Sequence, residues 1–317
     1  MAVSDGVHLL VPFAASAAPE ARQAVERLEL PNLQRLMRRL SVEATDAGDP
    51  HSLSAPHERV HARSLGLEPV DGLIPFAALQ VQQAGREPGD AGWAWITPCH
   101  WRVGRDHVDM AHPQDLQLDA DDSRTLLASM QPYFSEDGIE LAYDAPLRWL
   151  ARGDIFRSLP SASLDRVIGR TIDPWIPRGA LGGPVRRLQQ EMQMLLYTLP
   201  LNDERQRGGL LPVNSFWISG TGALPAAATR AADLQVTQYL RDAALRGDWR
   251  AWAAAWQQLD ARDCARLLAD MDRGRTVRIT LGGEAGTRTW SSAAVSGWRR
   301  LTGWFGAPTP ATLLEGL

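Results

Sequence analysis

Residues 210–222 constrain the fold of this chain more than any other stretch. An apolar run at 213–218, rich in β-branched and aromatic residues, leads directly into the sequence Ser-Gly-Thr-Gly at 219–222. This pattern predicts a buried strand that ends in a glycine-rich turn. In α/β proteins, ligands bind at the carboxyl ends of sheet strands, and glycine lets a ligand approach the main chain. A buried strand followed by an ordinary turn explains the same residues, and periodicity alone favours that interpretation.

Apolar spacing alternates between strand and helix patterns along the chain. Strands are expected at residues 7–13, 93–97, 138–143, 147–150, 276–281 and 287–290, the last two as a hairpin. Helices are expected at residues 20–28, 31–40, 56–65, 74–83, 121–131 and 184–199. Because the two patterns alternate at short spacing, the sequence predicts an α/β fold.

The segment after residue 225 is rich in alanine and is predicted to be helical to about residue 271. Trp249, Trp252 and Trp256 fall on one face of a helix there, which indicates a core position. The alternative is a scaffold protein that exposes these rings as an apolar surface patch. A short amphipathic helix with two further tryptophans is expected at 295–305.

Composition excludes several kinds of chemistry. All 33 basic residues of the 317 are arginine, so a phosphate-loop lysine, a Schiff-base lysine and a lysine general base are ruled out. The net charge of −4 offers no general basic field for nucleic acid or a membrane surface. Cys99 and Cys264 are the only cysteines, which predicts a reducing cytoplasm rather than a disulfide framework. No apolar stretch approaches the ~20 residues that span a bilayer.

One short motif raises the question of a metal. The sequence His-Glu-Arg-Val-His at 57–61 matches the His-Glu-x-x-His pattern of zinc peptidases, in which His57 and His61 would be ligands on one helix face. An ordinary solvated helix explains the same residues, since an arginine lies between the histidines and no third ligand is evident. We therefore predict no metal and no cofactor, with His57 and His61 as the alternative.

Arginine and glycine suggest candidate anion sites. His100, Arg102 and Arg105 follow the strand expected at 93–97, and arginine pairs well with phosphate or carboxylate. A surface loop with ordinary charges is the alternative. Glycines at 179–183 precede a helix that Pro184 is expected to open, where main-chain amides could face an anion. The candidate ligand-binding residues are His100, Arg102, Arg105, Arg178, Asn214, Ser215, Gly220 and Gly222.

Several short segments occur in a familiar order. They lie at residues 30–36, 65–69, 75–78, 88–91 and 200–214, and they read Leu-Pro-Asn-Leu-Gln-Arg-Leu, Leu-Gly-Leu-Glu-Pro, Pro-Phe-Ala-Ala, Pro-Gly-Asp-Ala and Pro-Leu-Asn-Asp-Glu-Arg-Gln-Arg-Gly-Gly-Leu-Leu-Pro-Val-Asn. In this order the chain resembles archaeal-type cofactor-independent phosphoglycerate mutases over roughly residues 5–225. The sequences Gln-Met-Leu-Leu at 193–196 and Pro-Val-Asn-Ser-Phe-Trp at 212–217 are similar to RpfE-type regulatory proteins of proteobacteria.

The resemblance implies a particular domain organisation. An alkaline-phosphatase-like core sheet flanked by helices would begin in residues 1–102. An inserted α/β subdomain would occupy 103–212, and a reduced, helix-rich return to the core would occupy 213–317. In the mutases the first strand ends in a metal-binding Asp-Gly, whereas this chain has Phe-Ala at 13–14. Their nucleophilic serine has no evident counterpart, and the chain has no histidine after His112 to serve as a late metal ligand.

These departures lead to a functional hypothesis. We expect a non-catalytic, cytoplasmic, phosphoglycerate-mutase-like regulatory protein that binds a small anionic ligand or a protein partner. The alternative is a phosphotransferase or phosphatase with a rearranged site, which would use a divalent metal and depend on His57, His61 or His100. Neither nucleic acid nor a membrane is an expected partner.

Overall fold

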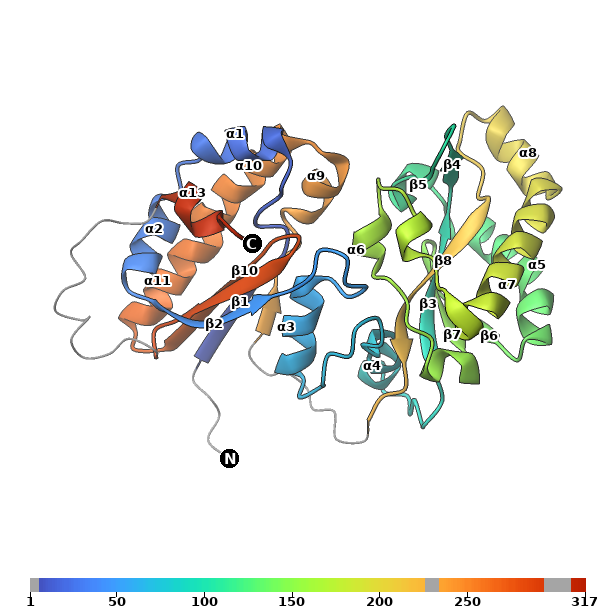
Figure 1. Ribbon diagram of the computed structural model, residues 1–317, viewed down its shortest axis with the longest axis horizontal. Coiled ribbons are helices and arrows are strands. Elements are labelled where there is room, and N and C mark those ends of the chain that lie inside the picture. The colour runs from blue at the N-terminus through green and yellow to red at the C-terminus, as the bar shows by residue number, and fades with distance from the viewer. Residues whose placement is uncertain (1–5, 226–233, 294–308) are drawn as a thin grey trace. The chain divides into compact units, whose positions relative to one another are not determined.

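The chain divides into two compact units in a computed structural model that describes residues 6–225, 234–293 and 309–317. The first unit comprises residues 1–51, 56–65 and 229–317, and the second comprises residues 52–55 and 66–228. Within each unit, strands form a sheet that is flanked by helices (Figure 1). The predicted α/β class is therefore confirmed.

The second unit is wider than the inserted subdomain expected at 103–212. It also contains residues 66–102 and 213–228, because the strands β3 (Trp93–Cys99) and β8 (Ser215–Gly222) pair with each other. Both strands belong to the sheet of the second unit, whereas the resemblance implied that they would belong to the core sheet.

The sheet of the first unit is built from strands at both ends of the chain. Its order is β2-β11-β10-β1-β9. These strands are β1 (Gly6–Val11), β2 (Ser41–Ala47), β9 (Leu234–Val236), β10 (Thr276–Gly282) and β11 (Gly286–Ser291). Strand β1 lies between β10 and β9 and runs parallel to both, and Gly6 pairs with Thr276. Strand β11 forms the predicted hairpin with β10 and is also antiparallel to β2.

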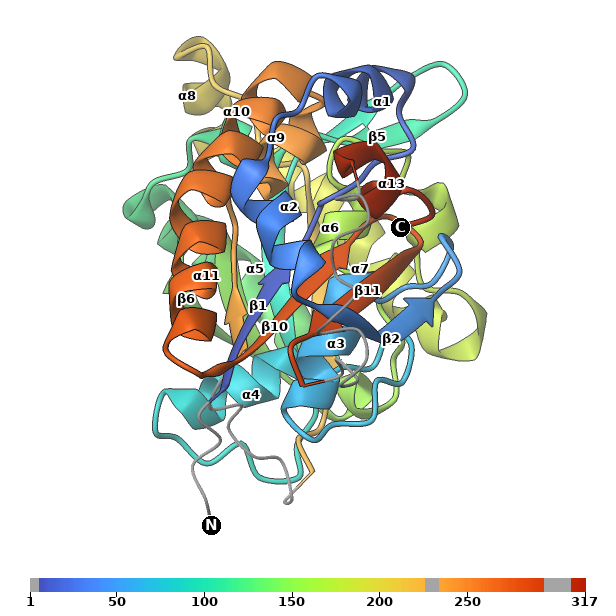
Figure 2. The same cartoon turned by 90° about the vertical axis from the view of Figure 1, so that its left-hand side faces the viewer.

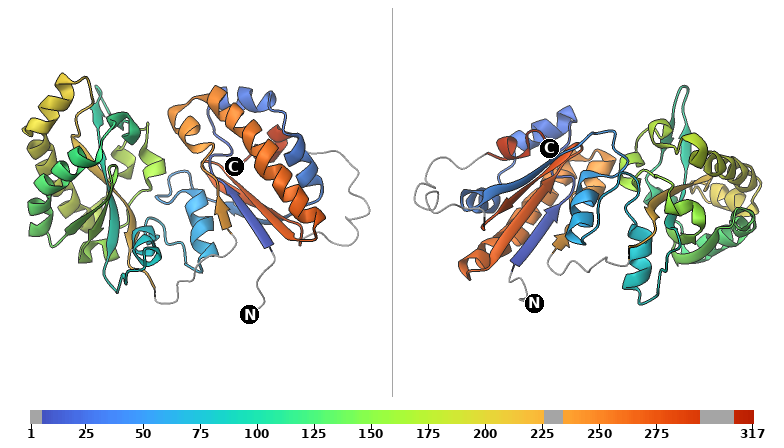
Figure 3. Two further views of the ribbon diagram at one scale, coloured as in Figure 1. Left: turned by 180° about the vertical axis from the view of Figure 1, so that it is seen from behind. Right: turned by 60° about the horizontal axis from the view of Figure 1, so that its bottom comes forward.

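One face of this sheet carries the apolar core. The side chains of Val7, Leu9 and Val11 are buried there, next to those of Ile279 and Leu281 on β10. Figure 2 shows the helices that cover this face, and Figure 3 shows α3 (Pro56–Ser64) on the other side. The helices of this unit besides α3 are α1 (Pro19–Glu26), α2 (Pro31–Arg38), α9 (Arg241–Arg246), α10 (Trp249–Leu259), α11 (Ala265–Asp272) and α13 (Pro310–Leu314).

Helix α10 supplies the largest side chains of this core. Trp252 and Trp256 are fully buried and lie edge-to-face, with ring centroids 6.2 Å apart. Burying a large apolar side chain contributes on the order of 1.5–3 kcal/mol. The core position expected for these rings is confirmed, and an exposed tryptophan scaffold is ruled out for Trp252 and Trp256.

A short π-helical turn at Asp260–Cys264 connects α10 to α11, and its first residue caps the amino-terminal end of α2. The buried carboxylate of Asp260 accepts hydrogen bonds from the main-chain N–H groups of Asn32 and Leu33, at 3.2 and 2.6 Å. These N–H groups belong to the first turn of α2, which has no partner for them within the helix. A carboxylate there also interacts favourably with the helix dipole.

The second unit contains an antiparallel four-stranded sheet. Its order is β6-β7-β3-β8, and a separate hairpin consists of β4 and β5. The strands besides β3 and β8 are β4 (Trp101–Val103), β5 (Val108–Met110), β6 (Glu140–Ala145) and β7 (Arg148–Arg152). The helices are α4 (Phe76–Gln83), α5 (Ala120–Glu136), α6 (Leu164–Val167), α7 (Gly179–Tyr197) and α8 (Pro200–Arg207). Apolar side chains of α5 and α7 fill the core on one face of this sheet.

The glycine-rich segment 219–222 is part of strand β8, so the predicted turn is wrong. Gly220 and Thr221 lie opposite the single residue Ala94, because Trp93 pairs with Gly222 and Trp95 pairs with Ser219. Two residues opposite one form a β-bulge. A β-bulge whose first residue has a left-handed backbone conformation needs glycine there, as a tight turn does. Gly220 has φ +64° and packs under the Trp95 ring. The sequence shows the need for glycine but does not distinguish a bulge from a turn.

The start of helix α7 differs from the expected one, and a second expected helix cannot be compared. Helix α7 begins at Gly179, five residues before Pro184, so Pro184 lies inside the helix that it was expected to open. The helix predicted at 295–305 falls outside the described residues. Of the helices that the structure describes, none combines the length and apolar character needed to cross a membrane.

Candidate functional site

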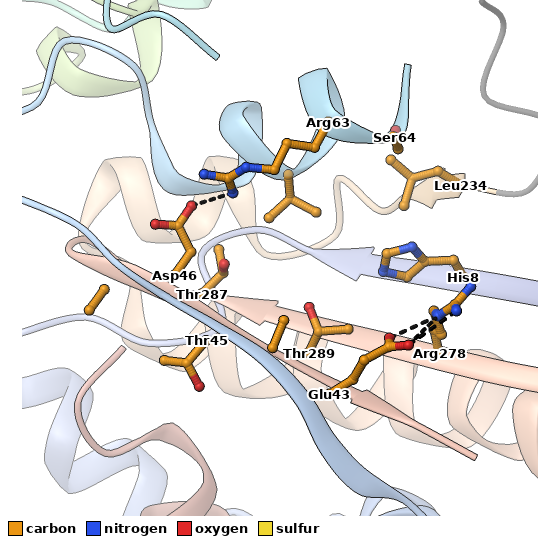
Figure 4. Close-up of a pocket in the computed structure, with 13 residues that line it drawn as sticks. His8, Glu43, Thr45, Asp46, Arg63, Ser64, Leu234, Arg278, Thr287 and Thr289 are labelled. Carbon is orange, nitrogen blue, oxygen red and sulfur yellow. Dashed lines mark hydrogen bonds and ion pairs between the residues drawn. The ribbon is translucent and has the colours of Figure 1, made fainter. Parts of the chain in front are cut away.

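The second face of the sheet in the first unit is polar and hollow. Side chains alternate along strands, so His8 on β1 and Arg278 and Thr280 on β10 point away from the apolar core. A hollow of about 890 Å³ lies on this face, between the sheet and α3 (Figure 4). A volume of this size is within the range of small-molecule sites. Its lining residues are His8, Glu43, Ala44, Thr45, Asp46, Ala47, Val60, Arg63, Ser64, Leu234, Arg278, Thr287 and Thr289.

A chain of hydrogen bonds crosses the floor of the hollow. Nε2 of His8 lies 2.8 Å from Oγ1 of Thr280, which lies 2.7 Å from Oγ1 of Thr289. Burial, together with the nearby charge of Arg278, lowers the pKa of His8 to about 4, against a smaller opposing effect of Glu43. His8 is therefore neutral at physiological pH.

Two clusters of charged side chains flank this chain of hydrogen bonds. On one side Arg278 binds Glu43, with Nε 2.8 Å from a carboxylate oxygen. On the other side Asp46 accepts from Nη1 of Arg63 at 2.5 Å and from Nε of Arg59 at 3.3 Å. Figure 4 shows Thr287 and Thr289 between the two clusters.

Two arginines hold the carboxylate of Asp46 in its charged form. Burial acts to raise the pKa of the Asp46 carboxyl, but the hydrogen bonds from Arg63 and Arg59 outweigh it, so the pKa lies below its ordinary value. One carboxylate thus accepts from two guanidinium groups, of which that of Arg63 is half-exposed at the hollow. A guanidinium group in this position favours a small anion on this face of the sheet.

Gly48, just after β2, provides the space that Arg59 occupies. A Cβ atom at Gly48 would lie 2.2 Å from Nη2 of Arg59, which is far inside van der Waals contact. Arg59 is buried, and its guanidinium is held against Asp46 from α3. Both the sheet and the helix therefore position the cluster.

The carboxyl end of β1 is blocked by aromatic side chains. Nε1 of Trp252 donates to the carbonyl oxygen of Phe13 at 2.9 Å, and Nε1 of Trp256 donates to that of Ala14 at 3.3 Å. Phe13 adopts φ +58°, a left-handed conformation that non-glycine residues rarely take. The ring of Phe13 also contacts that of His57, with centroids 5.5 Å apart.

His57 and His61 share helix α3, as their spacing predicts. Burial lowers the pKa of His61, and the neighbouring His57 adds to this effect. Among residues 6–225, 234–293 and 309–317, no group of three His, Cys, Asp or Glu side chains is arranged to hold a metal ion. The resemblance implies a metal-binding Asp-Gly at the end of the first strand, whereas residues 12–15 of this chain read Pro-Phe-Ala-Ala, so the described residues do not fit that metal.

The ligand-binding residues expected from the sequence all lie in the second unit, and three of them hold its strands together. Nδ1 of His100 lies 2.9 Å from the carbonyl oxygen of Pro212. The side-chain amide of Asn214 binds both the N–H and the carbonyl of Trp101, at 2.7 and 2.9 Å. Ser215 is buried and pairs with Cys99 across β3 and β8.

The other expected residues do not join this group. Arg102 and Arg105 are exposed on and beside the β4–β5 hairpin, where Arg102 lies 4.0 Å from Asp115. Arg178 is exposed and donates to the carbonyl of Asp173. Gly220 is five residues beyond Ser215 along β8, a separation of about 16 Å at ~3.3 Å per residue. Gly222 packs against Pro75.

Sequence reasoning missed the hollow of the first unit, although a signal was present. Residues 276–281 read Thr-Val-Arg-Ile-Thr-Leu, a strict alternation of polar and apolar side chains. Such alternation indicates a strand with one buried and one polar face. His8, between Val7 and Leu9, continues the pattern on the neighbouring strand.

Comparison with known proteins defines the fold. No protein-family model matches the chain, and no curated protein sequence matches it. The PH0037 protein from Pyrococcus horikoshii is structurally similar with a TM-score of 0.51 and 12% identity, over 90% of this chain and 86% of that chain. A cofactor-independent phosphoglycerate mutase from Thermoplasma acidophilum DSM 1728 aligns with a TM-score of 0.36 and 11% identity, over 90% of this chain and 89% of that chain. The similarity to the Pyrococcus protein indicates a shared fold.

Proposed function

We propose that this chain is a non-catalytic, phosphoglycerate-mutase-like protein that acts in regulation by binding a small anion in the hollow of the first unit. The regulatory role follows the resemblance to RpfE-type proteins. The ligand class follows from the charges on the polar face of the sheet.

The observation that carries the proposal is the arrangement at the carboxyl end of β1. In α/β sheets this is where ligands and catalytic groups gather. Here the main chain of Phe13 and Ala14 is bound by the indoles of Trp252 and Trp256. A buried aromatic cluster supplies neither a metal ligand nor a nucleophile, so the position is used for packing.

The anion site is supported by the Asp46 cluster. Arg63 is half-exposed and keeps guanidinium N–H groups on the side of the hollow, while Asp46 holds the group in place. Charge-assisted hydrogen bonds from guanidinium to a phosphate or carboxylate are among the stronger ones in proteins. The side chains of Thr287 and Thr289 also face the hollow, and the Thr289 hydroxyl shares a hydrogen bond with Thr280.

The first experiment tests for catalysis. The purified full-length protein is assayed for phosphoglycerate mutase and phosphatase activity with added Mn²⁺, beside an archaeal-type mutase as the positive control, and its metal content is measured. We expect no turnover above the blank. Turnover that follows stoichiometric metal would overturn the proposal, and substitution of His57, His61 and His100 would then locate the rearranged site.

A second experiment tests the anion site. Inorganic phosphate and 3-phosphoglycerate are titrated into the protein and followed by calorimetry, with Arg63→Gln as the variant and Arg35→Gln, on an exposed position of α2, as the control. Since hydrogen bonds to charged groups contribute ~1.5–3 kcal/mol, Arg63→Gln should weaken binding by about tenfold or more. If neither anion binds the wild type, or both variants bind equally well, the hollow is not an anion site.

A further inference from the structure

The second unit contains a hollow of its own, of about 820 Å³. One wall is the β4–β5 hairpin, and the other is formed by the end of α7 and by α8, all of which are labelled in Figure 1. Its lining residues are Trp101, Val103, Val108, Ile172, Asp173, Ile176, Gln193, Leu196, Tyr197, Thr198, Asn202, Asp203, Gln206, Pro212 and Asn214.

Large apolar side chains are exposed on opposite walls of this hollow. Val103 on β4 is 82% exposed, and Tyr197 at the end of α7 is 84% exposed. Exposed apolar side chains that gather around a concavity mark interaction sites, and tyrosine is enriched in protein interfaces. The exposed apolar side chains on the walls of this hollow therefore fit a polypeptide ligand that has apolar side chains of its own.

The charged groups of the hollow are of one sign. Asp173 and Asp203 are its only charged lining residues, and both are exposed. Within the described part of the chain, no ion pair is formed by either carboxylate. Complementary charge steers association and selects partners, so these carboxylates favour a ligand that carries lysine or arginine.

The main chain of β4 offers an edge for strand pairing. The N–H of Gly104 donates to the carbonyl of His107, and antiparallel pairs alternate between hydrogen-bonded and non-hydrogen-bonded positions. Val103 and Val108 therefore form a non-hydrogen-bonded pair, and the N–H and carbonyl of Val103 are directed away from β5. Trp101, two residues earlier, has the same orientation, and its outward groups bind the Asn214 side chain.

We propose that this hollow binds an extended segment of a protein partner, which pairs with the outer edge of β4 at Val103. Apolar side chains of the segment contact Val103 and Tyr197, and a lysine or arginine faces Asp173 and Asp203. Peptide binding by strand addition draws affinity from the main chain and specificity from side-chain pockets. The site is independent of the anion hollow in the first unit, so each proposal can fail without the other.

The test uses random nonapeptides displayed on phage and selected on the full-length protein, followed by fluorescence anisotropy with the selected peptides. We expect enriched sequences in which apolar residues alternate with arginine or lysine. The double variant Asp173→Asn/Asp203→Asn should weaken their binding about two- to thirty-fold, since each exposed ion pair contributes ~0.2–1 kcal/mol. Glu204→Gln removes a neighbouring exposed charge of α8 that does not line the hollow, and it should change binding less than about twofold.

A second variant tests the strand edge. Val103→Pro removes the outward N–H but spares the bonds that Arg102 and Gly104 make to β5, so it should abolish binding while circular dichroism stays unchanged. The proposal is overturned if selection yields no binder, or if the binders are acidic or bind the double variant as well as the wild type. It is also overturned if the protein forms a dimer that Tyr197→Ser dissociates, because the occupant is then a second copy of the chain.

Discussion

Replacing Gly220 by alanine should destabilise the second unit by about 3 kcal/mol. The backbone at Gly220 has φ +64°, where an L-residue costs on the order of 1–2 kcal/mol. The new Cβ atom would also lie 2.8 Å from Cε3 of Trp95, and overpacking of this kind costs ~1–3 kcal/mol. Trp95 has little room to move, since its ring stacks on Phe76 and its Nε1 donates to Gln80 at 2.7 Å.

Gly89→Ala is the matched control in the same unit. Gly89 has φ +62°, but its added Cβ atom would meet no atom within 4 Å. The control therefore carries the backbone cost alone, and the difference between the two variants, about 2 kcal/mol, measures the contact with Trp95. Urea unfolding followed by far-UV circular dichroism gives both values, provided that the slope against urea is unchanged.

Equal losses in the two variants would refute the steric reasoning. A Gly220→Ala protein with wild-type stability would refute the β-bulge explanation as well. We expect Gly220→Ala to lose more stability than Gly89→Ala. That result would show that glycine is needed at position 220 because the Trp95 ring packs against it.

Three further predictions concern other parts of the chain. Because the pKa of His8 falls from 6.5 to about 4 on folding, the unfolded state binds the proton first as the pH drops. Wild type should therefore lose up to about 3 kcal/mol more than His8→Asn between pH 6.5 and 4, measured as urea midpoints. Arg205→Ala should cost ~3–5 kcal/mol, because Arg205 is buried and pairs with Asp122 at 2.8 Å, whereas the exposed Arg207→Ala should be nearly neutral in the same urea measurement. Trp252→Phe leaves a carbonyl without its indole donor and should lower stability by ~1–3 kcal/mol in calorimetric melting.

The elements of this fold were largely predictable, because helices and strands leave different apolar periods. Helix α2 and strand β10 lie close to their expected positions, since Leu33, Leu36 and Met37 repeat on a helical face and residues 276–281 alternate. The assignment of strands to sheets was less accessible. Strand β8 is buried at every residue except the half-buried Gly220, and an apolar run of that kind carries no information about its partner or direction.

The candidate site was harder to predict than the fold. In the sequence Arg59 is only the arginine between two histidines, and Arg63 belongs to no motif. The role of both depends on Asp46, which reaches them from β2. Such a cluster exists only once the helix packs against the sheet, so no local pattern reveals it. His100 and Asn214 were candidate ligand residues, but their side chains form hydrogen bonds to the main chain of neighbouring segments.

The parallel pairing of β1 with β10 has a consequence for synthesis of the protein on the ribosome. Strand β1 cannot pair with β10 until the ribosome has synthesised Thr276, the partner of Gly6, which follows about 270 residues later. At ~5–20 residues per second, that delay is on the order of 10–50 s. The continuous stretch 66–228 is complete well before then and can fold while the nascent amino-terminal strands still lack their partners. Chaperones that bind exposed apolar strands would therefore be expected to act on the first fifty residues of the emerging chain.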